Sequence, residues 1–296
     1  ANIINQRNDY YGGRDLRYIA MPDGAASVTN SRFNSWQFEN YLTYSKDFNE
    51  DNSLTAMLGL SWQHVDEFNA VASTRGFADD FYGFNNLGAG SNPQTPTSGK
   101  VAYGLNSYFG RVNYDYKNKY LLTLTGRADG SSKFGPENQF AFFPSAALAW
   151  RVSGEDFLKQ NEIISNLKVR ASYGATGNSE IPAYRALAGL QSGSVIFGGD
   201  RAAYSVPQRM ANPDLRWEKT EQVDAGVEIG LFNNRIALEL DFYRKLTSDM
   251  LLDAPVPSAS GFTNVYRNVG SMENKGVEIN LNTINFDNEM FGWSSN

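Results

Sequence analysis

Apolar and polar side chains alternate with a period of two residues through most of this sequence. Successive side chains of a β-strand point to opposite faces, so this alternation predicts strands with one apolar and one polar face. Nine segments carry the pattern: residues 36–45, 54–62, 108–116, 120–127, 140–150, 167–173, 223–231, 236–242 and 277–282. A tenth begins near Phe291. The sequence therefore predicts an all-β fold of about ten strands.

The predicted strands are long, and the segments that join them alternate between short and long. Strands of about 10–15 residues exceed the usual length of about 5–6 in globular proteins and approach the length of a tilted membrane-crossing strand. The short connections are residues 47–52, 117–118, 233–234 and 286–290, and the long ones are residues 69–100, 130–139, 177–216 and 251–272. Outer-membrane barrels have short periplasmic turns and long external loops. We therefore predict an antiparallel, up-and-down transmembrane β-barrel.

Residues 153–166 depart from this alternation, because a short turn is expected there. Ser153-Gly-Glu-Asp resembles a helix N-cap followed by acidic residues, and apolar side chains come next. We expect a short periplasmic helix in this segment.

Aromatic side chains on the apolar parity fall near predicted strand ends. Tyr44, Tyr116 and Tyr120 lie next to short turns, whereas Trp36, Trp62 and Trp217 lie towards the long loops. Amphipathic rings collect at the two membrane–water interfaces. Two aromatic belts are therefore predicted, with Trp217 as an anchor at the outer interface.

Composition excludes several classes of function. The net charge of −6 and the lack of a Lys/Arg-rich run argue against a general nucleic-acid binder. The absence of cysteine excludes disulfides, zinc–thiolate sites and thiol catalysis. His64 is the single histidine, and we expect it to be a solvated residue at the barrel rim. The sequence thus predicts no catalytic, cofactor-binding or metal site, and a protein that is not an enzyme.

Weaker motifs were weighed and set aside. The acidic pairs Asp79-Asp80 and Glu50-Asp51 lack the spacing of a calcium loop, and the glycines of residues 88–92 lack the Lys-Ser/Thr of a phosphate loop. Glu228 and Glu239 are better explained as lumen-facing residues than as a glycosidase pair. The four aromatics of residues 76–88 suit stacking on sugar rings or gripping peptides, but packing of the loop onto the rim is the preferred explanation.

Five segments, in order, resemble the SusC/RagA group of TonB-dependent outer-membrane transporters. They are Arg127-Ala-Asp-Gly-Ser-Ser-Lys-Phe-Gly135, Ser172-Tyr-Gly-Ala-Thr-Gly-Asn178, the stretch from Asn212-Pro-Asp-Leu-Arg-Trp to Phe232-Asn-Asn-Arg-Ile236, Asp241-Phe-Tyr-Arg-Lys-Leu-Thr-Ser-Asp-Met-Leu-Leu252, and Asn268-Val-Gly-Ser-Met-Glu-Asn-Lys-Gly-Val-Glu278. In these motifs we expect Asn233 and Asn234 to close a turn with positive φ. None of the motifs carries catalytic chemistry.

The resemblance implies a barrel of about 22 strands filled by a plug. It also implies a TonB complex as energy source, a SusD-like surface lipoprotein as lid, and glycans or peptides as substrates. We expect residues 1–296 to form part of one such barrel domain, with the plug domain, signal peptide and last strands outside this chain. The polar side chains Arg111, Arg127, Lys168, Arg170, Glu228 and Glu239 would then face the plug or the passing substrate, or pair with charges on neighbouring strands.

Two alternatives stay open at the level of sequence. The first is a passive porin or structural outer-membrane barrel, which would lack a plug. The second is a soluble, secreted glycan-binding β protein, which would stay in solution without detergent.

Overall fold

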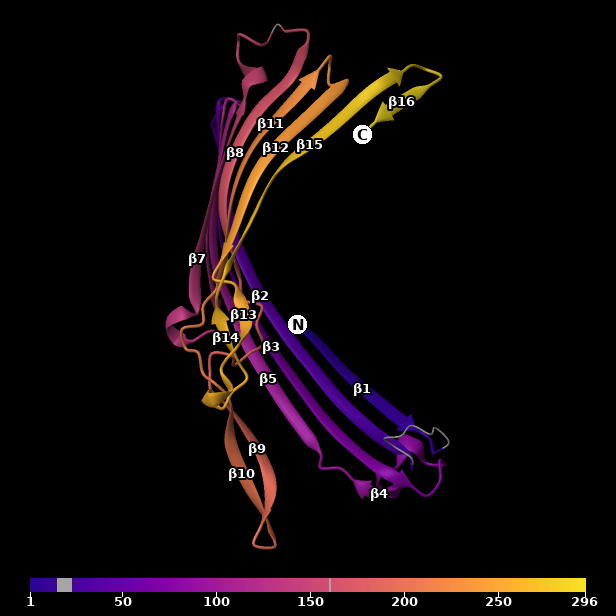
Figure 1. The fold of residues 1–296 in the computed structure, drawn as a ribbon. Helices are drawn as coiled ribbons and strands as arrows, with labels where there is room; N and C mark the ends of the chain where they lie inside the picture. The colour runs from indigo at the N-terminus through magenta and orange to yellow at the C-terminus, as the bar shows by residue number, and fades with distance from the viewer. Residues whose placement is uncertain (15–22, 160) are drawn as a thin grey trace. The chain divides into compact units, whose positions relative to one another are not determined.

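The computed structural model describes residues 1–14, 23–159 and 161–296, and most of them lie in β-strands (Figure 1). The strands are β1 (Asn2–Gly12), β2 (Ala25–Asn49), β3 (Asn52–Phe77), β4 (Gly90–Pro93), β5 (Thr97–Tyr116), β6 (Tyr120–Ser131), β7 (Phe140–Arg151), β8 (Ile164–Asn178), β9 (Gly189–Phe197), β10 (Asp200–Arg209), β11 (Glu218–Leu231), β12 (Ile236–Ser248), β13 (Leu251–Pro255), β14 (Asn264–Asn268), β15 (Ser271–Asp287) and β16 (Gly292–Ser295). Short 3₁₀ turns punctuate them: η1 (Gly83–Asn85), η2 (Leu87–Ala89), η3 (Pro136–Asn138), η4 (Val152–Gly154) and η5 (Ser258–Ser260). No helix among the described residues has the length and apolar character needed to cross a membrane.

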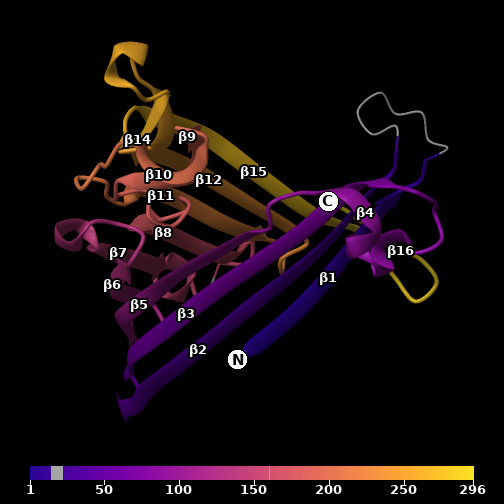
Figure 2. The same ribbon diagram turned by 90° about the horizontal axis from the view of Figure 1, so that it is seen from below.

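All ten predicted strands are present, so the all-β, antiparallel prediction is confirmed. The main sheet has the order β1-β2-β3-β5-β6-β7-β8-β11-β12-β15-β16, with β4 paired to β3. Consecutive strands of the chain are neighbours wherever no hairpin intervenes, as Figure 2 shows for β6, β7 and β8. The sequence did not predict β1, β4 or the two separate hairpins β9–β10 and β13–β14, which lie within long connections.

The chain divides into two units, which are described separately. Unit 1 comprises residues 1–38 and 62–105, and unit 2 comprises residues 39–61 and 106–296. In unit 1, β1 pairs with β2 from Asn2 opposite Ser35 to Gly12 opposite Ala25. In unit 2, β6 to β8 and β11 to β15 form the pairs that carry the residues of interest.

The short connections of unit 2 are hairpin turns with left-handed backbone. Lys117 and Asn118 have φ of 58° and 53° between β5 and β6. Phe232, Asn233 and Asn234, with φ of 52°, 57° and 60°, lie between β11 and β12, and the sequence predicted positive φ at the two asparagines. Asparagine tolerates positive φ well, and positive φ in a tight turn matches the twist of the two strands that it joins. The predicted sorting of short turns and long loops is thus confirmed here.

The helix expected in residues 153–166 is wrong. Among the described residues, the connection contains only the 3₁₀ turn η4 and a further turn, and β8 already begins at Ile164. Ser153 is not an N-cap, because the turn that was expected to propagate closes at Glu155. The carboxylate of Glu155 instead accepts hydrogen bonds from Lys119 Nζ (2.7 Å), Tyr120 Oη (2.8 Å) and Trp150 Nε1 (3.1 Å). These three bonds hold the connection against β6 and β7 without a helix.

The apolar parity of the unit 2 strands is exposed. Leu148 is 60% exposed, Phe242 53% and Ile279 69%, although each belongs to a long and regularly paired strand. Burying such a side chain in a soluble protein would stabilise it by about 1.5–3 kcal/mol, so a whole sheet face of them requires an apolar environment. Lipid contact on this face accounts for the exposure.

Aromatic rings stack at the turn end of unit 2. Tyr116, Tyr120 and Trp150 form a row with centroid separations of 6.1 and 6.3 Å, which confirms the grouping of Tyr116 and Tyr120 beside a short turn. In unit 1, Trp36 stacks on His64 at 6.0 Å. His64 does not lie at the outer end of its strand as predicted, because β3 continues to Phe77.

The predicted interfacial role of Trp217 is wrong. Its ring is only 9% exposed and packs against Phe134 and Phe143, while Nε1 donates to the Gln139 carbonyl oxygen at 2.8 Å. A buried cluster surrounds it, which we call the loop core: Phe134, Phe143, Ala175, Ile181, Ala186, Leu215 and Trp217. The sequence prediction placed Trp217 in lipid because its position matches the apolar parity of the following strand. However, β11 begins only at Glu218, and outside a strand the parity of a residue does not determine where its side chain points.

Candidate functional site: the polar face of unit 2

The polar parity of three neighbouring strands, β8, β11 and β12, brings charged residues into register. Lys168 on β8 lies opposite Glu228 on β11, and Glu228 lies opposite Glu239 on β12. Two residues further along the strands, Arg170 lies opposite Gly226, and Gly226 lies opposite Asp241. Directly opposite residues in an antiparallel sheet have their side chains close together on one face, so these groups form a single cluster.

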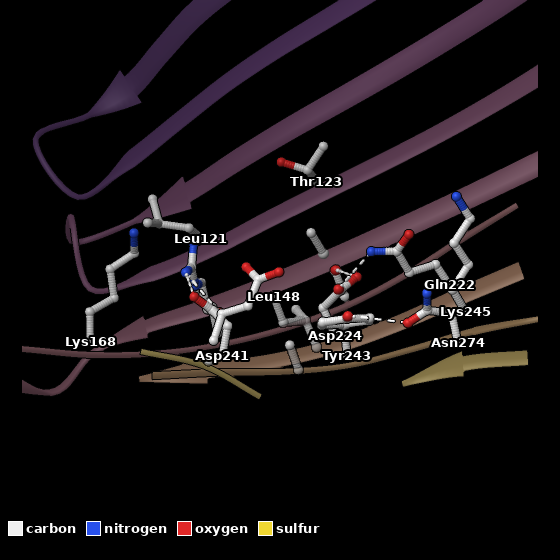
Figure 3. A pocket seen from close by; sticks show the side chains of 17 residues that line it. Leu121, Thr123, Leu148, Lys168, Gln222, Asp224, Asp241, Tyr243, Lys245 and Asn274 are labelled. Atoms are coloured by element: carbon white, nitrogen blue, oxygen red, sulfur yellow. Dashed lines mark hydrogen bonds and ion pairs between the residues drawn. The ribbon is translucent and has the colours of Figure 1, made fainter. Parts of the chain in front are cut away.

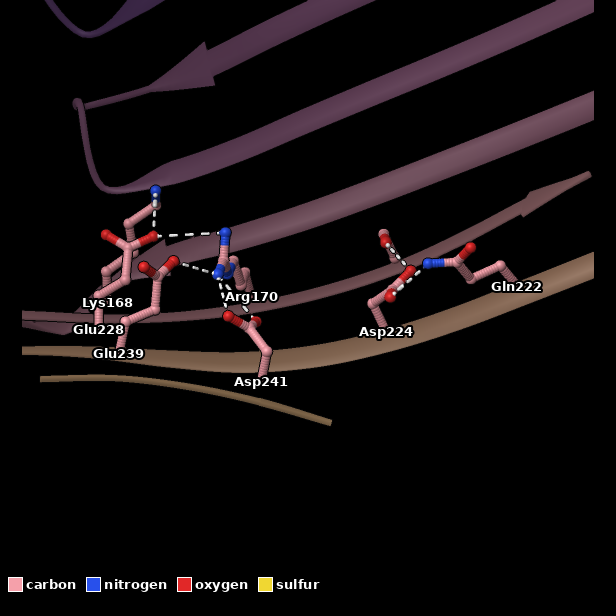
Figure 4. A network of polar contacts seen from close by, with 8 residues as sticks. Lys168, Arg170, Gln222, Asp224, Glu228, Glu239 and Asp241 are labelled. Carbon is pink, nitrogen blue, oxygen red and sulfur yellow. Dashed lines mark hydrogen bonds and ion pairs between the residues drawn. The ribbon is translucent and has the colours of Figure 1, made fainter. Parts of the chain in front are cut away.

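Arg170 is the centre of this cluster (Figure 4). Its Nη2 donates to Glu239 Oε1 at 2.5 Å and to Asp241 Oδ2 at 2.6 Å, and its Nη1 lies 3.8 Å from Glu228 Oε1. The guanidinium reaches Asp241, two strands away, by lying over Gly226. A Cβ at that position would sit 2.6 Å from Arg170 Nε, so the glycine makes the crossing possible.

Lys168 completes the cluster with Nζ 3.1 Å from Glu228 Oε1. Two cations thus meet three carboxylates, and the cluster carries one net negative charge. Its members are about one quarter to one third exposed, which leaves them in contact with water rather than in a dry core. Pairs of this kind are screened and individually weak, but a shared guanidinium fixes the geometry of all three acids.

A second set of polar groups continues the same face towards the loop end. Asp224 accepts hydrogen bonds from Ser172 Oγ at 3.2 Å and Gln222 Nε2 at 2.8 Å. Tyr243 Oη donates to Asn274 Oδ1 at 3.2 Å. Amide, hydroxyl and carboxylate groups therefore follow one another along the face.

These groups line a groove of about 630 Å³ (Figure 3). Its lining residues are Leu121, Thr123, Ala147, Leu148, Ala149, Lys168, Arg170, Ala171, Ser172, Gln222, Asp224, Gly226, Asp241, Tyr243, Lys245, Asn274 and Glu278. The small side chains of β7 and β8 form its floor beside the ionic cluster. The groove presents hydrogen-bonding and charged groups, which suit a hydrated polar solute.

The structure places the other predicted polar residues on the same face but apart from the cluster. Arg127 donates to Asp129 Oδ1 at 2.6 Å and to Ser107 Oγ at 2.9 Å, and Arg111 donates to Thr125 Oγ1 at 3.3 Å. Lys168, Arg170, Glu228 and Glu239 thus pair across strands, as the alternative interpretation expected, whereas Arg127 pairs along its own strand.

The remaining candidates carry local contacts. His64 Nε2 lies 3.1 Å from Asp66 Oδ2, and Asp51 lies 3.7 Å from Lys117 Nζ. Asp80 accepts a 2.5 Å hydrogen bond from Tyr11 Oη, and this bond lowers the pKa of the Asp80 carboxyl. Of the aromatics in residues 76–88, Phe77 packs inward while Phe81 is 83% exposed, so packing explains only part of that stretch. Within the described ranges no group of three or more His, Cys, Asp or Glu side chains is arranged to hold a metal.

Sequence reasoning missed Asp241 and Gly226, which complete the cluster. The signal for Asp241 was present, because it shares parity with Glu239 in residues 236–242. The part played by Gly226 depends on the register of three strands, which a single sequence does not reveal.

Long antiparallel strands, sorted connections, an exposed apolar face and a charged opposite face define the wall of a membrane β-barrel. The family model described as "TonB dependent receptor-like, beta-barrel" matches residues 2–296, and the chain belongs to this family. It is accordingly part of a bacterial outer-membrane protein.

Named relatives agree with this assignment. The chain is 41% identical over 294 residues to TonB-dependent receptor P26 of Formosa agariphila, covering 98% of this chain and 30% of the relative. It is 33% identical over 291 residues to TonB-dependent receptor SusC of Bacteroides thetaiotaomicron, covering 97% of this chain and 27% of the relative. The chain therefore spans less than a third of the length of either relative.

Solved structures share the fold. The RagAB peptide transporter superposes with a TM-score of 0.88 at 32% identity, over 97% of this chain and 32% of the solved chain. The siderophore receptor PirA of Acinetobacter baumannii superposes with a TM-score of 0.53 at 12% identity, over 95% of this chain and 42% of the solved chain, a likeness of fold alone.

Proposed function

We propose that this chain is a wall segment of an active outer-membrane importer of large nutrients, oligosaccharides or peptides. In this proposal residues 1–296 are part of one barrel domain of a longer receptor, whose plug domain lies elsewhere in its sequence. A SusD-like surface lipoprotein would act as lid, and a TonB complex would supply energy. Similarity to the RagAB peptide transporter supports peptides as cargo, and similarity to TonB-dependent receptor SusC supports the SusC type of importer.

The observation that carries the proposal is the contrast between the two faces of the unit 2 strands. One face exposes large apolar side chains such as Phe242 and Ile279, and the other holds the Arg170 cluster beside a groove of about 630 Å³. A wall that separates lipid from an aqueous path needs both faces. The polar face would contact the plug or the moving cargo, and nothing about that role requires the cargo to be chemically changed.

The test uses the full-length receptor in its own bacterium, compared with a strain that lacks the gene. Fluorescent oligosaccharides and peptides too large for diffusion pores are supplied with and without a protonophore, which abolishes energy transfer to the outer membrane. We expect uptake of one class in the complete strain, its loss in the deletion strain and in the presence of protonophore, and recovery of the label on an intact molecule. Uptake that survives the protonophore would establish a passive porin instead, and uptake unaffected by the deletion would refute the proposal.

A further inference from the structure

Two long connections of unit 2 meet beside the loop core. Asn212, in the segment between β10 and β11, donates its backbone N–H to the Ala186 carbonyl at 3.2 Å. Its side-chain Nδ2 donates to the Tyr266 carbonyl on β14 at 2.7 Å. Ala186 itself is buried in the loop core. These contacts fix the backbone directly after Arg185.

Arg209 folds back onto the same backbone. It ends β10 opposite Gly189, and its guanidinium donates to the Tyr184 carbonyl at 2.9 Å and to the Leu187 carbonyl at 3.3 Å. A Cβ on Gly189 would lie 3.1 Å from Arg209 Cζ, so a larger residue there would push the guanidinium away. The two bonds bracket Arg185 in the sequence and bring the second arginine beside it.

Arg185 lies over an aromatic ring, with its Cζ 5.1 Å from the Tyr266 ring centroid. Its Nε is buried and makes no hydrogen bond. Burial, and then the neighbouring charge of Arg185, lower the pKa of the Arg209 guanidinium. Two partly buried cations therefore lie side by side. The cation–π contact of Arg185 with the Tyr266 ring offsets only a small part of their repulsion.

Other buried or partly buried cations in unit 2 have acidic partners. Arg170 has three carboxylates, Lys119 has Glu155 at 2.7 Å, and the buried Lys133 has Glu180 at 3.6 Å. Across residues 1–14, 23–159 and 161–296, no ion pair includes Arg185 or Arg209. A buried charge is costly unless it is paired.

We propose that Arg185 and Arg209 form a binding site for an anionic group, a carboxylate or sulfate, carried by the imported nutrient. The inference rests on the proposed function, because the site lies in loops of the importer wall. Guanidinium groups bind planar carboxylate and sulfate oxygens through paired, charge-assisted hydrogen bonds. The negative charge of the anion offsets the repulsion between the two arginines.

The test is protection of the two arginines from phenylglyoxal in the purified full-length receptor. Modification at each arginine is measured by peptide mass spectrometry, with added sulfate, galacturonate or an N-acetylated dipeptide, against galactose and against chloride at equal ionic strength. We expect the anions to slow modification of Arg185 and Arg209 about tenfold and to leave the exposed Arg267 unchanged. Galacturonate and the dipeptide distinguish an acidic glycan from a peptide terminus as the source of the anion.

Variants make the test specific. Arg185→Gln should abolish anion protection of Arg209, whereas Arg267→Gln should leave it intact. Equal modification rates with and without anion would overturn the inference, as would complete resistance of both arginines without any anion, since a carboxylate elsewhere in the receptor would then be their partner. Energy-dependent uptake that continues in Arg185→Gln with unchanged preference for acidic over neutral cargo would refute this inference alone, and loss of all such uptake in wild type would refute the proposed function.

Discussion

At the scale of single residues, the polar face depends on a position that has no side chain. Gly226 lets Arg170 cross β11 and reach Asp241, so one guanidinium serves acids on two strands. Glycine is ordinarily unfavourable inside a strand, by roughly 0.5–1 kcal/mol relative to alanine. Opposite Arg170 and Asp241, it leaves the space that the guanidinium occupies and that a Cβ would block.

Gly226→Ala should separate Arg170 from Asp241, because the added methyl group would overlap Asp241 Oδ1 and Arg170 Nε. Loss of the charged hydrogen bonds outweighs the gain in strand propensity, and we expect a net destabilisation of about 1 kcal/mol. Denaturant unfolding of the full receptor in lipid vesicles measures it. Gly292→Ala is the control, since nothing lies within 4 Å of its added Cβ, and it should be neutral or slightly stabilising. The same outcome for both variants would contradict this role of Gly226.

Sequence parity predicted which residues share the polar face, including Lys168, Arg170, Glu228 and Glu239. It did not predict their partners, because pairing depends on the register between strands distant in sequence. The misassignment of Trp217 has a related cause. Parity holds only inside a strand, and the loop core that buries this ring is assembled from three separate connections together with Phe143 of β7 and Ala175 of β8.

At the scale of elements, a strand of this protein is a two-sided boundary. Ile279 and Asn280 are neighbours near the middle of β15, both exposed, on opposite faces. The two side chains differ in what they face: Ile279 faces lipid, and Asn280 faces water.

Ile279→Arg should destabilise the receptor by about 2–4 kcal/mol, because it places a charge at mid-membrane depth among lipid chains. Asn280→Arg should cost far less, since the same charge would enter water. Unfolding in lipid vesicles compares the two. Equal costs, or a larger cost for Asn280→Arg, would reverse the assignment of faces.

The connection between β7 and β8 shows how an element can be held without a helix. Hydrogen bonds from Lys119, Tyr120 and Trp150 lower the pKa of Glu155 from 4.5 to about 2. In the predicted helix, Glu155 would have stabilised the first turn through local contacts. Its carboxylate instead accepts hydrogen bonds from Lys119 and Tyr120, at the start of β6. Such long-range partners are invisible to capping rules, which consider only local sequence.

Because the pKa of Glu155 is lower in the folded protein, its stabilising effect is complete above pH 4.5 and is lost as the pH falls from 4.5 towards 2. We expect the fluorescence of Trp150, obtained by difference from Trp150→Phe, to change over this window. Glu155→Gln should remove the change, since an amide does not titrate there. A Trp150 signal that follows the same pH course in both proteins would show that Glu155 is not its cause.

At the scale of the whole molecule, unit 2 combines a β-barrel wall with a loop core that is anchored on the ends of β7 and β8. The wall has no interior of its own, and its stability comes from paired strands and the membrane. The loop core has a small buried interior, with Leu215 fully buried and Trp217 nearly so. The sequence predicted the wall well, because periodicity and connection length encode it, but it gave no sign of the loop core.

Leu215→Ala should loosen the external loops and leave the wall intact. Removing a buried leucine side chain typically costs about 2–5 kcal/mol, and here that loss falls on the loop core alone. We expect faster tryptic cleavage at Arg209 and Arg216 on intact cells, with an unchanged unfolding transition of the barrel. Leu252→Ala, at a position 44% exposed, is the matched control and should not increase cleavage. If barrel unfolding shifted as much as loop cleavage, the two parts would not be independent.

The hairpin β9–β10 pairs only within its own two-stranded sheet, and in Figure 1 it extends outward from the loops. Its tip at Gly198 and Gly199 has open space around it. Among the described residues, the strands of the wall do not pair with this hairpin, so its tip can change in length and sequence without shifting the register of a membrane strand. The chemistry that the tip presents can therefore vary while the paired strands of the wall stay the same.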